Sequence, residues 1–151
     1  MKRREFLLGG TGALALAGGA ASLWTMRMST PASATEGTFE VARSDEEWRA
    51  LLSPAQYKVL REEGTERAFT SPLNEEKRAG TFHCAGCDLP VYSSDAKYDS
   101  GTGWPSFWEA LPDAVDTHED NSFFMTRIEC HCRRCGGHFG HIFDDGPPPT
   151  G

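Results

Sequence analysis

The sequence has little cysteine and no excess of positive charge, and each shortage narrows the range of possible functions. Only five of its 151 residues are cysteine, which is too few for a small scaffold held together by disulfides. Fifteen basic residues against 22 acidic ones give a net charge of −7, which argues against non-specific binding to nucleic acid. Hydrophobic residues make up 38%, and the 16 glycines bring the apolar total to about 49%, which is typical of a globular chain. The length suits one domain, since single cores use about 100–200 residues.

Charge is unevenly distributed along the chain, because residues 1–34 carry a net charge of +3 and the remaining 117 residues carry −10. A basic start is followed by a Leu-, Ala- and Gly-rich run over residues 7–23 and then by small residues, the pattern of a cleaved secretory signal. Arg3 and Arg4 resemble the start of a twin-arginine export signal. An uncleaved membrane anchor is the alternative, but five glycines in the run weaken a spanning helix. We therefore expect residues 1–34 to be a signal peptide and residues 35–151 to be an exported domain in the periplasm or another extracytoplasmic space.

Two short helices are expected at the start of this domain. Ser44 and Glu47 form a capping box for the first helix. Ser53 followed by Pro54 marks the start of the second helix, which we expect to end at Gly64. Beyond that point the pattern favours short strands separated by turns, at residues 81–84, 89–92, 124–132 and 139–143. The sequence therefore predicts a mainly β, antiparallel domain with a helical start.

Four of the five cysteines form two Cys-x-x-Cys pairs, Cys84 with Cys87 and Cys132 with Cys135. Each pair lets one tight turn aim two thiolates at one point, and two such turns supply the four sulfurs of a tetrahedral zinc site. The 44 residues between the pairs exceed the usual spacing of a zinc ribbon, so the ion would join distant parts of the fold. Disulfides and a redox-active pair are the alternatives. Against them, a bridge across three residues closes too short a loop to stabilise the chain much, and no βαβ pattern surrounds either pair.

Cys130 is the cysteine outside these pairs. Alternation along residues 124–132 places Cys130 and Cys132 on the more apolar face of a strand, and Glu129 and His131 on the opposite face. One interpretation of Cys130 is a small buried hydrophobic residue. The other is a redox partner or an attacking thiol.

Two further segments are candidates for substrate chemistry. Residues 100–108 combine glycines with three aromatic rings, among them Trp104, whose face suits a methyl group or a centre that gains positive charge. Residues 136–141 place His138 and His141 three positions apart, beside the second cysteine pair. Because four thiolates are already available to a metal, these imidazoles are candidates to donate protons. A packed aromatic loop and two structural histidines are the alternative.

Both cysteine pairs, the segment Gly-Thr-Gly-Trp-Pro-Ser-Phe at 101–107 and the segment His-Phe-Gly-His-Ile-Phe-Asp-Asp-Gly-Pro at 138–147 resemble one family, the B-type peptide methionine-R-sulfoxide reductases. The resemblance covers nearly all of residues 53–151 in order. It implies two packed antiparallel sheets with short N-terminal helices. It also implies the site residues: a structural Zn²⁺ held by Cys84, Cys87, Cys132 and Cys135, a wall for the S-methyl group at Trp104, and a pair that binds and polarises the sulfoxide oxygen at His138 and His141.

The resemblance further implies the reaction and the partners. A thiolate attacks the sulfur of methionine-R-sulfoxide in an oxidised protein, methionine leaves, and the resulting cysteine sulfenic acid is restored by a second thiol or by an external reductant. We therefore expect oxidised proteins as substrates and a thioredoxin-like or other thiol reductant as a partner. A monomer is the default expectation, and no nucleic acid is expected to bind.

The chain departs from the family's pattern at the nucleophile. In the family the attacking cysteine lies a few residues after the Gly-Pro-x-Pro-Thr-Gly turn, which here occupies residues 146–151. The family's common resolving position, beside Gly103, holds Thr102. We therefore expect residues 35–151 to lack the final strand, and the 151-residue chain to be a C-terminally truncated, inactive fragment whose nucleophilic cysteine lies beyond Gly151. The alternative is a non-catalytic zinc-binding module that binds oxidised peptides.

Overall fold

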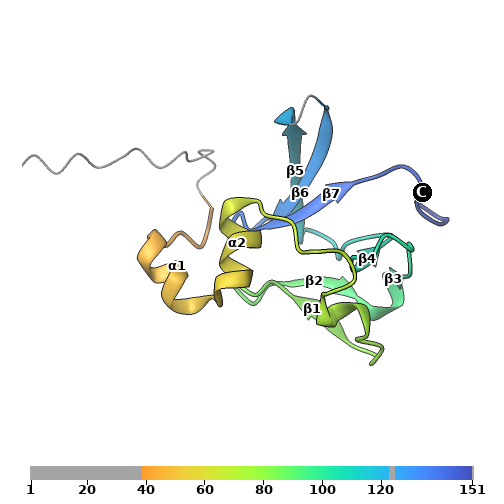
Figure 1. The fold of residues 1–151 in the computed structure, drawn as a ribbon, viewed down its shortest axis with the longest axis horizontal. Coiled ribbons are helices and arrows are strands. Elements are labelled where there is room, and N and C mark those ends of the chain that lie inside the picture. Colours follow the sequence, from red (N-terminus) through yellow and green to blue (C-terminus); the bar gives the residue numbers. More distant parts are fainter. Residues whose placement is uncertain (1–38, 123–124, 151) are drawn as a thin grey trace, which may run out of the picture. The chain divides into compact units, whose positions relative to one another are not determined.

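A computed structural model describes residues 39–122 and 125–150 (Figure 1). Two helices come first and seven short strands follow: α1 Asp45–Leu51, α2 Pro54–Glu62, β1 Thr81–His83, β2 Pro90–Ser93, β3 Lys97–Tyr98, β4 Ser106–Phe107, β5 Val115–Asp120, β6 Arg127–Cys132 and β7 His138–Ile142. Two 3-10 turns, Pro72–Asn74 and Ser94–Ala96, lie between them. In these described ranges no helix is long and apolar enough to span a bilayer. Residues 1–34, where the sequence predicts an export signal, lie outside the described residues.

Both helices begin at capping boxes. Before α1, the Ser44 hydroxyl accepts a hydrogen bond from the Glu47 backbone N–H, and the Ser44 N–H donates to the Glu47 carboxylate. Ser53 and Gln56 make the same reciprocal pair before α2, where Pro54 occupies the first helical position. The predicted helix starts are therefore confirmed, because a capping serine and a residue three positions later satisfy backbone N–H groups that the helix itself leaves unpaired.

The end of α2 differs from the expectation. Glu63, rather than Gly64, adopts the left-handed conformation, with φ of 52°. Gly64 is still required at the next position, because a Cβ there would lie only 2.7 Å from the Lys58 carbonyl oxygen. Gly64 is therefore needed because the helix backbone at Lys58 lies so close to it, and the positive φ that ends the helix belongs to Glu63.

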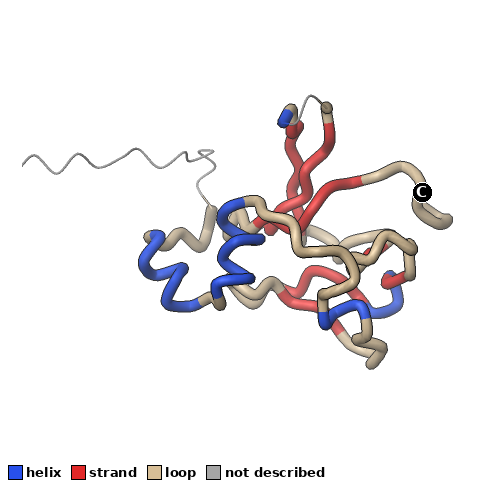
Figure 2. Tube along the Cα trace, in the orientation of Figure 1, coloured by secondary structure: helices blue, strands red, loops and turns tan. Residues whose placement is uncertain are grey.

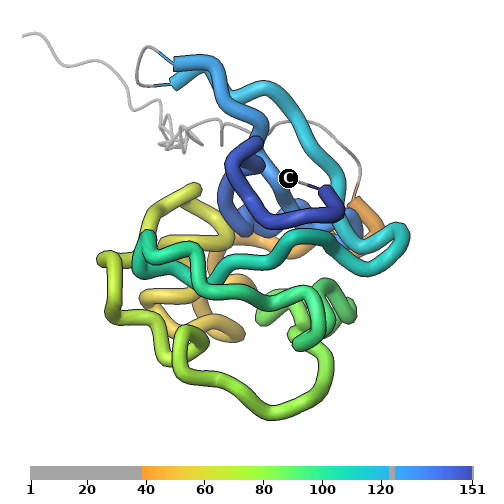
Figure 3. The backbone as a smooth tube through the Cα atoms, turned by 90° about the vertical axis from the view of Figure 1, so that its right-hand side faces the viewer, coloured from red at the N-terminus to blue at the C-terminus, as the bar shows by residue number. Residues whose placement is uncertain are grey.

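Within residues 39–122 and 125–150 the strands pair antiparallel in three small sheets, where the resemblance implied two. β1 pairs with β2, β3 pairs with β4, and β5, β6 and β7 form a three-stranded sheet in that order. The β5–β6 hairpin extends away from the rest of the domain in both Figure 2 and Figure 3. The predicted class, mainly β and antiparallel with short helices at the start, is confirmed.

Three strands and one burial pattern were not expected from the sequence. β3, β4 and β5 carry no clear hydrophobic alternation, and they are held by their ladder partners. On β6, Cys130 and Cys132 are buried as expected, but Ile128 is 38% exposed and Glu129 only 4% exposed. The structure therefore buries Glu129, which the sequence places on the less apolar face of β6.

Sulfur atoms take a large share of the core. Three cysteines, Cys84, Cys132 and Cys135, are buried in one cluster with Trp48, Leu52, Tyr57, Val91 and Ala114. Beside this cluster the Tyr92 ring stacks on Phe107, with ring centroids 4.3 Å apart, and meets Phe139 edge to face at 6.1 Å. Tyr92 thereby joins β2, β4 and β7, one strand from each sheet.

The turn after the second cysteine pair gives a test of this packing. Gly136 has φ of 68°, and a Cβ there would lie 2.3 Å from the Phe39 ring. Gly101 has φ of 71° but open space around the same position. We expect Gly101→Ala to lower the free energy of unfolding by about 1–2 kcal/mol through backbone strain. Gly136→Ala should add a further loss of about 1–3 kcal/mol from overpacking, measured by urea unfolding. Equal losses in the two variants would contradict this packing.

Candidate functional site

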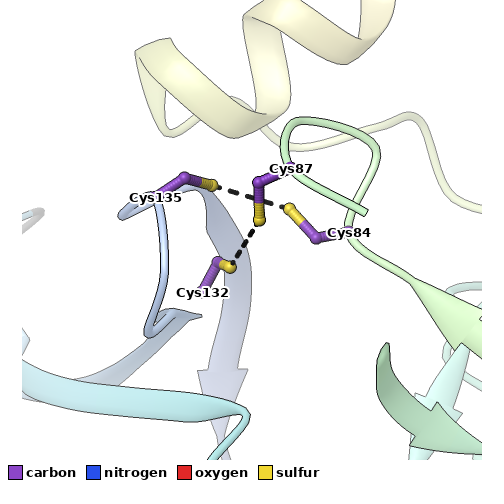
Figure 4. Close-up of side chains that lie close together, drawn as sticks. All are labelled: Cys84, Cys87, Cys132 and Cys135. Atoms are coloured by element: carbon purple, nitrogen blue, oxygen red, sulfur yellow. Dashed lines mark hydrogen bonds between the residues drawn. The ribbon is translucent and has the colours of Figure 1, made fainter. Parts of the chain in front are cut away.

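The four paired cysteines meet at one point (Figure 4). Cys84 and Cys87 come from the turn between β1 and β2, and Cys132 and Cys135 come from the end of β6 and the turn that follows. The Sγ atoms of Cys84 and Cys135 are 3.7 Å apart, and those of Cys87 and Cys132 are 3.5 Å apart. All four sulfurs lie within 4.8 Å of one another. Each close contact joins one pair to the other, so the cluster brings residues from two different sheets together.

The two cysteine turns have the same pattern of backbone hydrogen bonds. The carbonyl of the first cysteine accepts from the N–H four residues on, at 2.8 Å for Asp88 onto Cys84 and 2.8 Å for Gly136 onto Cys132. The N–H of the first cysteine donates to the carbonyl five residues on, in both turns. Asp88 and Gly136 are also both left-handed, with φ of 60° and 68°. This shared turn is what aims both thiols of each pair at the common centre.

The donor set and its spacing fit a structural Zn²⁺ ion. A tetrahedral zinc with bonds of about 2.3 Å to sulfur places its sulfurs about 3.8 Å apart, close to the distances of 3.5 and 3.7 Å seen here. Sulfurs joined as a disulfide would be about 2.05 Å apart, and all five cysteines are free thiols. The shared four-sulfur arrangement is also unlike an independent redox pair at Cys84 and Cys87.

The four thiols lie so close together that they compete for charge. Hydrogen bonds from Cys135 and then Cys84 lower the pKa of the Cys132 thiol, because they stabilise its thiolate. The hydrogen bond to Cys132 raises the pKa of Cys84 to about 12 and also raises the pKa of Cys135. One thiol therefore ionises easily at the expense of its neighbours. A bound dication would remove this conflict by stabilising all four thiolates.

His138 and His141 lie together on β7, beside the metal cluster. Their ring centroids are 5.4 Å apart, and the rings are inclined at 67°. His138 is buried, with 5% of its surface exposed. The two imidazoles that the sequence singled out are therefore neighbours in the structure.

Each of these histidines is held by a carboxylate from a neighbouring strand. His138 Nδ1 lies 2.6 Å from Glu129 Oε1, and His141 Nε2 lies 2.7 Å from Asp120 Oδ2. A carboxylate on one ring nitrogen orients the ring and selects its tautomer. The other nitrogens, Nε2 of His138 and Nδ1 of His141, are the ones these contacts leave for a ligand.

The Asp120 carboxylate is itself well supported. Hydrogen bonds from the side chain and backbone N–H of Ser122, followed by those from His141 and Arg127, hold the pKa of the Asp120 carboxyl well below its usual range. Arg127 Nη2 lies 2.5 Å from Asp120 Oδ2. Asp120 therefore remains ionised at neutral pH and acts as a fixed anion beside His141.

Trp104 lies on a separate loop, and 40% of its surface is exposed. Its indole Nε1–H donates to the Glu66 carbonyl at 2.8 Å, which holds the ring edge and leaves much of the ring open. The preceding Gly103 is needed there, because a Cβ would lie 2.8 Å from Phe69, whose N–H donates to the Gly103 carbonyl. The loop thus presents a fixed aromatic surface.

Cys130 is poorly suited to nucleophilic attack. It is 8% exposed, and its Sγ lies 3.6 Å from the Tyr92 hydroxyl. Burial raises the pKa of the Cys130 thiol, which disfavours the reactive thiolate. Glu129, the adjacent residue on β6, contacts His138, and successive strand residues point to opposite faces of a sheet. Cys130 therefore points away from the face that carries the histidine pair.

Sequence reasoning missed the carboxylates that hold the histidines. The alternation places Glu129 on the less apolar face of its strand without giving it a partner, and Asp120 lies on β5, a strand that was not predicted. The available signal was the alternation of β6, which puts Arg127, Glu129 and His131 on one face. Which of these is buried depends on β5 and β7, whose pairing with β6 the local pattern does not show.

The metal cluster gives a direct test on two cysteines of the same strand. We expect the Co²⁺-loaded chain to show the strong thiolate-to-metal absorption of a four-sulfur site, and Cys132→Ser to lose most of it along with thermal stability, because one ligand is removed. Cys130→Ser is the matched control and should keep the band. Equal loss of the band in both variants would contradict this ligand set.

Comparison with known proteins agrees with this geometry. The SelR domain matches residues 52–151. A peptide methionine sulfoxide reductase MsrB of Methanosarcina mazei is 52% identical over 113 residues, covering 74% of this chain and 81% of the relative. The proteins of the same name from Pseudomonas putida and Thiobacillus denitrificans are 53% and 54% identical, covering 74% and 72% of this chain and 85% and 83% of the relatives. This chain therefore belongs to the SelR-domain family, together with the MsrB methionine sulfoxide reductases.

Proposed function

We propose that this protein acts in the reduction of methionine-R-sulfoxide to methionine in oxidised proteins. The observation that carries the proposal is the pair of adjacent imidazoles, His138 and His141, each held by its own carboxylate. Two oriented imidazoles are suited to bind one polar oxygen and supply a proton to it. The family membership supports the same reaction, because the relatives are named as methionine sulfoxide reductases.

Each site residue has a distinct role in this proposal. Nε2 of His138 and Nδ1 of His141 bind the sulfoxide oxygen, since their other ring nitrogens are occupied by Glu129 and Asp120. The exposed Trp104 ring contacts the S-methyl group, and its π face also suits a sulfur that gains positive character. The four-cysteine zinc site holds the turn from which β7 starts, so it positions the histidines without contacting the substrate.

The reaction balances with one thiol as the reductant. The thiolate attacks the sulfur atom of the sulfoxide, while an imidazole delivers a proton to the sulfoxide oxygen. Transfer of the oxygen to the thiol then releases methionine, so the methionine sulfur is reduced and the thiol becomes a sulfenic acid. A second thiol condenses with the sulfenic acid, forming a disulfide and water, and a thioredoxin-like or other external thiol reduces the disulfide.

We propose that none of the five cysteines in residues 1–151 is the attacking thiol. Four of them form the metal cluster, and Cys130 is buried on the opposite face of β6 from Glu129. The attacking thiol would then come from outside these residues. The 151 residues would supply the binding surface and the proton, acting as a monomer.

Binding of a short peptide that contains methionine-R-sulfoxide tests the site independently of the attacking thiol. We expect the zinc-loaded chain to bind this peptide, and His138→Gln and His141→Gln to weaken the binding by about tenfold each, the loss of one hydrogen bond worth about 1.4 kcal/mol. Isothermal titration calorimetry measures the affinity. His83→Gln, which changes an exposed histidine paired with Asp88, is the control.

Two outcomes would overturn this proposal. The first is a wild-type chain that binds the oxidised peptide no better than the same peptide with unoxidised methionine. The second is equal weakening in His83→Gln and in the two site variants. In the same samples with excess dithiothreitol we expect no turnover, and measurable reduction of the peptide would show that one of the five cysteines attacks after all.

We also propose that residues 1–34 direct export through a twin-arginine-type pathway and are removed after Ala34. The basic start and the glycine-rich apolar run support this export. The pathway is also compatible with the zinc site, because it carries proteins that have already folded around a metal. We expect the native protein in the extracytoplasmic fraction to begin at Thr35, as read by intact mass and N-terminal sequencing. A protein that stays in the cytoplasmic fraction with Met1 intact would contradict export.

A further inference from the structure

A second group of possible metal ligands lies on the three-stranded sheet, apart from the cysteines. It consists of His118 on β5 and Glu129 and His131 on β6. His118 is directly opposite Glu129 in the strand pairing, and its Nε2 lies 2.7 Å from Glu129 Oε2. The rings of His118 and His131 are 5.4 Å apart between centroids. One ligand atom from each of the three residues lies within 4.8 Å of those of the other two.

Two features distinguish this group from ordinary surface contacts. Glu129 is a buried carboxylate, yet it lies between two imidazoles, with Oε1 on His138 and Oε2 on His118. The Nδ1 atom of His131 is buried and has no hydrogen-bond partner within the described part of the chain. A buried polar nitrogen without a partner costs about 1–3 kcal/mol, so a ligand bound through Nδ1 of His131 would be stabilising.

We propose that His118, Glu129 and His131 form a second metal site, for a divalent transition ion of the zinc class. Two imidazoles with one carboxylate suit Zn²⁺, Co²⁺, Ni²⁺ or Cu²⁺, whereas Mg²⁺ and Ca²⁺ prefer all-oxygen sites. Three protein ligands leave one position open to water, unlike the closed four-sulfur site. The partial exposure of His118, whose side chain is 41% exposed, gives solvent access on that side.

The required adjustment is small. Bonds of about 2.0–2.1 Å to nitrogen and oxygen at a tetrahedral ion place the ligand atoms about 3.3 Å apart. His118 Nε2 and Glu129 Oε2 would therefore open from their present 2.7 Å, and the most distant pair would close from at most 4.8 Å. His118 is the residue free to move, since it is half exposed while Glu129 is fixed by His138.

Glu129 joins this second site to the histidine pair. The ion would take Oε2, and Oε1 would keep its contact with His138 Nδ1 at 2.6 Å. A carboxylate shared in this way between a metal and an imidazole fixes the position of both. Occupation of the second site would therefore hold Glu129, and through it the His138 ring, in one place.

Cobalt added to the chain loaded with only one equivalent of zinc, which the four-thiolate site binds first, is the probe. Co²⁺ binds nitrogen, oxygen and sulfur sites more weakly than Zn²⁺, so it leaves the four-sulfur site occupied by zinc. We expect the wild-type chain to bind one equivalent of Co²⁺ with weak visible absorption and no thiolate-to-metal band. Equilibrium dialysis followed by metal analysis should give two metals per chain, one zinc and one cobalt.

Single substitutions identify the ligands. His118→Gln and His131→Gln should each weaken Co²⁺ binding at least tenfold. His83→Gln should leave it unchanged, and it is a close match because the His83 side chain is 43% exposed against 41% for His118. His118→Gln alters a half-exposed side chain, so it keeps the test valid even if His131→Gln folds poorly. Absence of Co²⁺ binding in the wild-type chain, or binding that is equal in His118→Gln and the wild type, would overturn the proposal.

Discussion

The four-sulfur cluster is the constraint on which the rest of the domain depends. It joins the turn after β1 to the turn after β6, and three of its cysteines are part of the main buried cluster. Helix α2 covers it, with Leu60 close to Gly86 and Gly137 and Arg61 donating to the Cys135 carbonyl at 2.9 Å. In the described residues the three sheets have only two or three short strands each, and sheets this small need further packing to be stable. The metal thus replaces part of the apolar core that a larger domain would have.

The second organising feature is the buried carboxylate of Glu129. A charge removed from water is costly unless it is paired and hydrogen-bonded, and here both oxygens have imidazole partners. These partners explain why Glu129 can be buried, with only 4% of its surface exposed. The histidine pair, the carboxylates and the group around His118 are therefore one connected polar network on the three-stranded sheet. The zinc cluster lies at the end of β6 and holds that sheet in position.

Local patterns in the sequence identified much of the fold and of the site. The capping serines placed both helix starts, because capping depends on residues only three positions apart. The spacing of the cysteine pairs identified the metal ligands, since each pair needs a single tight turn. The strands β3, β4 and β5 could not be predicted in the same way. They show no hydrophobic alternation, and their extended conformation depends on the strands with which they pair.

By itself, then, the sequence determined the helix starts, the four thiolates, the two neighbouring histidines and the family. Each of these depends on residues that lie close together in the sequence. Only the tertiary structure decided which acidic residues hold His138 and His141, because Glu129 and Asp120 come from neighbouring strands. It also decided that Cys130 points away from that pair and that His118 meets Glu129 across the sheet. The physical reason is that strand pairing sets which residues face each other, and this register joins positions far apart in the sequence.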